Sequence, residues 1–91
     1  ILSVAGRESD RPAADKNVLE AHSLARAHDC AAASLTAIGA PATCIIDQAV
    51  QTGSSLIVMG SHGHGWIYER LIGSTAAHVA SLAPMPVLLV R

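Results

Sequence analysis

Aromatic side chains are almost missing from this sequence of 91 residues, which has no phenylalanine, one tryptophan and one tyrosine. Hydrophobic residues nevertheless make up 51% of the chain, so a folded core must consist of alanine, valine, isoleucine and leucine. The length predicts one domain, residues 1–91. A domain of this size buries only about 60–65% of its unfolded surface, which predicts marginal stability for the isolated chain.

Charged side chains are also scarce, at 14% of the residues, where roughly a quarter is usual. Such a bare surface indicates that another chain covers part of it. The formal net charge is −1, so no basic field is available to bind nucleic acid, and we expect no nucleic-acid partner. No apolar run approaches the ~20 residues that a membrane-spanning helix needs, and we expect no membrane association.

Cysteine occurs twice, at Cys30 and Cys44, and the two positions fit no metal-ligand spacing. We interpret them as reduced, mostly buried thiols of a cytoplasmic protein in preference to a disulfide. His62 and His64 are two residues apart, but no third ligand with clear spacing lies nearby, so no metal site is predicted.

Short apolar runs alternate with segments of helical periodicity along the chain. The runs predict strands, and the third is the clearest because it is continuously apolar: residues 1–5, 32–38, 56–59 and 87–90. The periodic segments predict helices, the last of them capped by Ser74 or Thr75: about 13–28, 41–52 and 74–83. This alternation predicts an α/β fold with a parallel sheet and right-handed crossovers.

The segment GSHGHGWIYERLIGST, residues 60–75, follows the third strand and contains four glycines. Ligands bind at the carboxyl ends of parallel strands, and glycine lets backbone N–H groups face an anion without a Cβ in the way. A helix that starts at Ser74 adds free N–H groups and the positive end of its dipole. The alternative is that these glycines only turn the chain. Neither GxxxxGK[ST] nor GxGxxG is present.

The spacing Gly60-x2-Gly63-x9-Gly73-Ser74-Thr75 resembles the G-x2-G-x9-G-[ST] motif of the ATP-binding universal stress proteins. The strand before it and the terminal strand 86–90 resemble that family as well. The resemblance implies a Rossmann-like open parallel sheet of order 3-2-1-4-5 and a homodimer through strand 86–90. It also implies ATP as ligand, with or without Mg²⁺, held by a set of residues at the strand end and the helix start: Met59, Gly60, His62, Gly63, Gly73, Ser74 and Thr75.

The chain departs from the family at its front, where it is one βα unit short. The family's first strand is followed by an aspartate that holds the adenine or ribose end of the nucleotide. If residues 1–5 are that strand, Gly6 lies near the aspartate position, and Glu8 or Asp10 could substitute only by a loop shift. The other alignment makes residues 1–5 the family's second strand, so that the first strand and helix are missing. The chain would then be an N-terminally incomplete member, a fragment or tandem protein that receives the missing strand from elsewhere. We favour the first alignment, with strand order 2-1-3-4. Under the other alignment the central strand would be missing, and the backbone groups of its two neighbours would be left unpaired.

Two functions are compatible with these features. One is an ATP-binding stress-response module that acts through dimerisation and nucleotide-dependent association with itself or unknown protein partners. Its hydrolysis would be slow at most, because no general base is identifiable, and Ser74 has no histidine–acid partner, so no catalytic residue is assigned. The alternative is a structural dimerisation module that has lost the aspartate side of the site.

Overall fold

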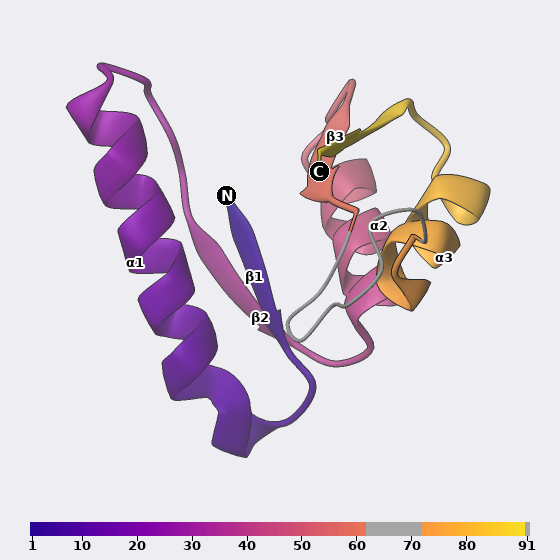
Figure 1. Ribbon diagram of the computed structural model, residues 1–91, viewed down its shortest axis with the longest axis horizontal. Coiled ribbons are helices and arrows are strands. Elements are labelled where there is room, and N and C mark those ends of the chain that lie inside the picture. The colour runs from indigo at the N-terminus through magenta and orange to yellow at the C-terminus, as the bar shows by residue number, and fades with distance from the viewer. Residues whose placement is uncertain (62–71, 91) are drawn as a thin grey trace. The chain divides into compact units, whose positions relative to one another are not determined.

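The computed structural model describes residues 1–61 and 72–90, and these fall into two compact units, Ile1–Cys44 and Ile45–Arg91 (Figure 1). Each unit contains one pair of parallel strands with a packed helix. The α/β fold with parallel strands and flanking helices is therefore confirmed. The expectation that residues 1–91 form one domain stays a prediction.

The first unit pairs β1 (Leu2–Ala5) with β2 (Leu35–Ile38) in parallel, in the register Leu2↔Leu35 to Ala5↔Ile38. The 3-10 turn η1 (Glu8–Asp10) leads into α1 (Arg11–Ala27), which packs against both strands. The buried residues of α1 and β1 are small and aliphatic, as the lack of aromatics requires: Ala5, Ala14 and Val18.

The sequence placed the start of the second strand at residue 32, and this was wrong. The strand begins at Leu35, and residues 29–34 form an exposed connection in which His22 Nδ1 of α1 contacts Ser34 Oγ. Alanine has little preference for strands, so the alanines at 31–33 cannot extend the ladder. Both cysteines are free thiols, but Cys30 is exposed and only Cys44 is partly covered, which corrects the expectation of two mostly buried thiols.

The helix α2 (Pro41–Gln51) begins at the expected proline and ends before a glycine in the left-handed region. Gly53 has φ of 64°, and its N–H donates to the Val50 carbonyl while the Ser54 N–H donates to the Ala49 carbonyl. These two bonds satisfy carbonyls that the helix end would otherwise leave unpaired. Gly53 is thus a position where the backbone conformation itself favours glycine.

The second unit pairs β3 (Ile57–Gly60) with β4 (Val87–Val90) in parallel, in the register Ile57↔Val87 to Gly60↔Val90. The connecting helix α3 (Ser74–Leu82) packs against β4. Ala76 and Val79 are the buried residues of α3. The terminal strand lies where the sequence predicted it, and β3 is shifted by one residue.

The favoured strand order 2-1-3-4 contains both observed pairs, β1 with β2 and β3 with β4. It also requires β1 beside β3, and that neighbour relation stays a prediction. No helix in the described ranges 1–61 and 72–90 is long and apolar enough to cross a membrane.

The one side chain of α3 that is fully buried offers a test of the core. Val79 is 0% exposed and Leu82, one turn later, is 67% exposed. We expect Val79→Ala to lower the free energy of unfolding by about 2 kcal/mol, because it removes buried methyl groups and leaves a cavity. The control Leu82→Ala should change it by less than about 0.5 kcal/mol. Urea denaturation of the two variants measures this, and equal losses would contradict the packing of α3.

Candidate functional site

The described half of the candidate site comprises the end of β3 and the start of α3. Met59 and Gly60 close β3, and Gly73, Ser74 and Thr75 lie at the beginning of α3. His62 and Gly63, the other two predicted site residues, lie outside the described residues, as do His64 and Trp66.

Ser61 connects the end of β3 to the start of α3. Its carbonyl accepts a hydrogen bond from the Gly73 N–H with an N–O distance of 2.7 Å, and its own N–H donates to the Val90 carbonyl at 2.9 Å. Ser61 is only 6% exposed. The structure therefore brings the last residue of β4 and the first turn of α3 to one point at the carboxyl end of β3. The sequence did not single out Ser61, because it stands at an unspecified position of the glycine motif.

The start of α3 leaves backbone donors available. Gly73, not Ser74 or Thr75, is the N-cap residue, so the predicted cap was wrong, and no side chain bonds the cap. The first helical hydrogen bond runs from the Ala77 N–H to the Gly73 carbonyl at 2.9 Å. The N–H groups of residues 74–76 come before that bond, and like the first amides of any helix they have no intrahelical acceptor. They also lie at the positive end of the helix dipole.

The conformation of Gly73 does not explain why it is glycine. Its φ of −61° and ψ of 156° lie in the extended region that every residue adopts. What glycine contributes at this position is the absence of a Cβ next to N–H groups that have no intrahelical acceptor. An anion could approach the backbone closely there, which is the arrangement by which helix starts bind phosphate.

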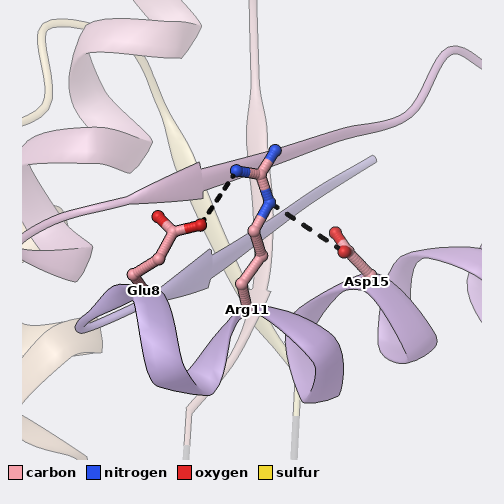
Figure 2. Close-up of polar contacts among 3 residues, drawn as sticks. All are labelled: Glu8, Arg11 and Asp15. Carbon is pink, nitrogen blue, oxygen red and sulfur yellow. Dashed lines mark hydrogen bonds and ion pairs between the residues drawn. The ribbon is translucent and has the colours of Figure 1, made fainter.

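The segment that follows β1 carries arginines and carboxylates in close pairs. Figure 2 shows Arg11 between Glu8 and Asp15, with Nη1 to Oε1 at 3.3 Å and Nε to Oδ2 at 4.0 Å. Asp10 is paired with Arg7 at 3.3 Å. The side chains are half or more exposed, so each pair contributes little to stability. Both carboxylates that could replace the aspartate thus have an arginine partner.

Within the described residues no group of three or more histidine, cysteine, aspartate or glutamate side chains could hold a metal ion. The described part of the site presents backbone N–H groups and the hydroxyls of Ser74, which is exposed, and Thr75, which is half-buried. Such donors suit an anion.

Comparison with known proteins identifies the family. The model of the universal stress protein family matches residues 2–91. The chain belongs to the universal stress protein family. It is 42% identical over 60 residues to the universal stress protein YxiE of Bacillus subtilis strain 168. It is also 43% identical over 53 residues to a universal stress protein from the QAH/OAS sulfhydrylase 3′ region of Thermus aquaticus.

These matches cover 66% and 58% of this chain, but only 40% and 39% of the two relatives. The chain thus matches about two fifths of the length of its curated relatives. Among solved structures, the hypothetical protein MJ0577 has a similar fold, with a TM-score of 0.70 and 24% identity. That similarity covers 98% of this chain and 72% of MJ0577, and it shows the fold alone. The predicted membership in the universal stress protein family is confirmed.

Proposed function

We propose that this universal stress protein binds ATP and acts through dimerisation and nucleotide-dependent association, with slow hydrolysis at most. The observation that carries the proposal is Gly73. This glycine stands at the start of α3 in a conformation open to any residue, beside amides that come before the first helical bond. A phosphate that needs close backbone approach accounts for a residue without a Cβ there.

The phosphate chain of ATP would lie against the N–H groups of residues 74–76, with the hydroxyls of Ser74 and Thr75 as further donors. Met59 and Gly60, at the end of β3, would line the other side. The family resemblance adds His62 and Gly63 to this set. A Mg²⁺ ion would be held chiefly by the phosphate oxygens and water, as is usual for this ion. Slow hydrolysis is proposed because the sequence offers no identifiable general base.

The second candidate is a dimerisation module that binds no nucleotide. If β1 corresponds to the family's first strand, Gly6 stands where the family has an aspartate, and the nearby Glu8 and Asp10 are paired with arginines. Under that alignment, the half of the site that holds adenine or ribose in the family would be changed in this chain. In either case we propose a homodimer through strand 86–90 in the cytoplasm, where the two free thiols would stay reduced.

Titration calorimetry with Mg-ATP, Mg-ADP and AMP separates the two functions. We expect Mg-ATP to bind more tightly than AMP, because only the longer phosphate chain reaches both halves of the motif. The emission of Trp66, the only tryptophan, should shift saturably with Mg-ATP and less with AMP, and the shift should weaken with salt. An absence of both heat and emission change would favour the dimerisation module. Tight binding with unchanged Trp66 emission would be compatible with the proposed ATP site. It would exclude a change in the surroundings of Trp66, between Gly63 and Gly73, on binding.

A further inference from the structure

The backbone of Ser61 makes two hydrogen bonds that point to different parts of the second unit. The carbonyl accepts from Gly73, at the start of α3, and the N–H donates to Val90, at the end of β4. The residue is 6% exposed, so water cannot readily replace either bond. A buried peptide group that loses its partner costs free energy, and the two bonds are therefore expected to persist together.

We infer that Ser61 is a positioning residue that links the occupancy of the α3 start to the carboxyl end of β4. The inference rests on the proposed ATP binding and names how that binding is communicated. A phosphate at the N–H groups of residues 74–76 requires α3 to begin where it does. The bond from the Gly73 N–H to the Ser61 carbonyl sets that starting point. The N–H of the same Ser61 donates to the Val90 carbonyl, at the end of β4.

Binding therefore stabilises the state in which both bonds of Ser61 are formed, by a free energy that rises logarithmically with the ratio of ligand concentration to Kd. The end of β4 belongs to strand 86–90, through which we propose that the protein dimerises. Linkage is reciprocal, so a partner strand that orders the end of β4 raises the affinity for ATP by the same factor. Nucleotide state and self-association would thus be coupled within one βαβ unit.

Amide hydrogen exchange measured by NMR with and without Mg-ATP tests this link, and the chain supplies an internal control. The Ile57 N–H donates to the Pro86 carbonyl at 3.0 Å, at the opposite end of the same pair of strands. At saturating Mg-ATP we expect the exchange of the Ser61 and Gly73 amides to slow by about tenfold more than that of Ile57. An equal slowing of all three amides would indicate stabilisation of the whole unit and would overturn the inference.

The variant Gly73→Pro removes the N–H that donates to Ser61, and the observed φ of −61° suits proline. The proline ring also places a Cβ at this position and is expected to weaken Mg-ATP binding, so calorimetry first sets the Mg-ATP concentration that gives the same fractional occupancy in variant and wild type. We expect the Ser61 amide of the variant to gain no extra protection over Ile57. Full protection in the variant would overturn the link, and if the variant does not fold, the wild-type comparison decides alone. Failure of the wild type to bind Mg-ATP would overturn the proposed function and this inference together, whereas binding without selective protection overturns only the inference.

Discussion

Gly73→Val is expected to lower the affinity for Mg-ATP by at least about a hundredfold, equivalent to about 2.7 kcal/mol of binding free energy. A branched Cβ at the start of α3 would occupy the space through which a phosphate reaches the backbone N–H groups. The fold should tolerate the substitution, because φ of −61° and ψ of 156° are ordinary values for valine. Titration calorimetry measures the affinity, and far-UV circular dichroism should stay near that of the wild type.

A glycine of the opposite kind provides the matched control. Gly53 has φ of 64° and no atom within 4 Å of an added Cβ, so its role is conformational and not steric. Gly53→Ala should lower the free energy of unfolding by about 1 kcal/mol and leave ATP affinity unchanged. Gly73→Val should instead lower the ATP affinity and leave the free energy of unfolding nearly unchanged. Unchanged ATP affinity in Gly73→Val would refute a close phosphate approach at this glycine. The companion substitution Gly63→Val, which lies outside the described residues, is expected to abolish binding in the same way.

Leu88→Glu is expected to convert a homodimer into a monomer at micromolar concentration. In the described pairing, β4 has β3 on one side, and Leu88 in its middle is 52% exposed. An apolar strand with unpaired backbone groups favours pairing with another strand, and a two-fold axis would place β4 against its symmetry mate. Two glutamates brought together across that axis would repel each other. Pro86 has no N–H, which limits the pairing at the start of the strand.

Light scattering measures the effect, and we expect the dimer dissociation constant to rise by about a hundredfold or more, which is about 2.7 kcal/mol. The matched control is Leu19→Glu, since Leu19 is 67% exposed on α1, away from strand 86–90 in the sequence. It should leave the dimer intact. A wild-type chain that is monomeric at micromolar concentration, together with unchanged size and stability in Leu88→Glu, would refute the dimer.

The helix ends show where local sequence was a sufficient guide and where it was not. Pro41 and Gly53 marked the limits of α2 correctly, because proline and glycine act on their own backbone angles. Ser74 and Thr75 are good capping residues by type, yet Gly73 is the cap. The Gly73 N–H bonds to Ser61, which precedes it by a long stretch of chain, and this contact sets where α3 begins.

By itself, the sequence determined the alternation of strands and helices, the aliphatic core, the family and the placement of β4. The strands, the helices and the core follow from hydrophobic periodicity and from residues that act on their own dihedral angles, so they can be read locally. The family follows from the resemblance of the glycine motif. Only the structure showed that Ser61 links β4 to α3 by hydrogen bonds and that Cys30 is exposed. It also showed that Glu8 and Asp10 form ion pairs with arginines. Each of these depends on which groups distant or neighbouring chain segments bring within bonding distance. The physical reason is that hydrogen bonds and burial are properties of pairs and surroundings, which no single position in the sequence encodes.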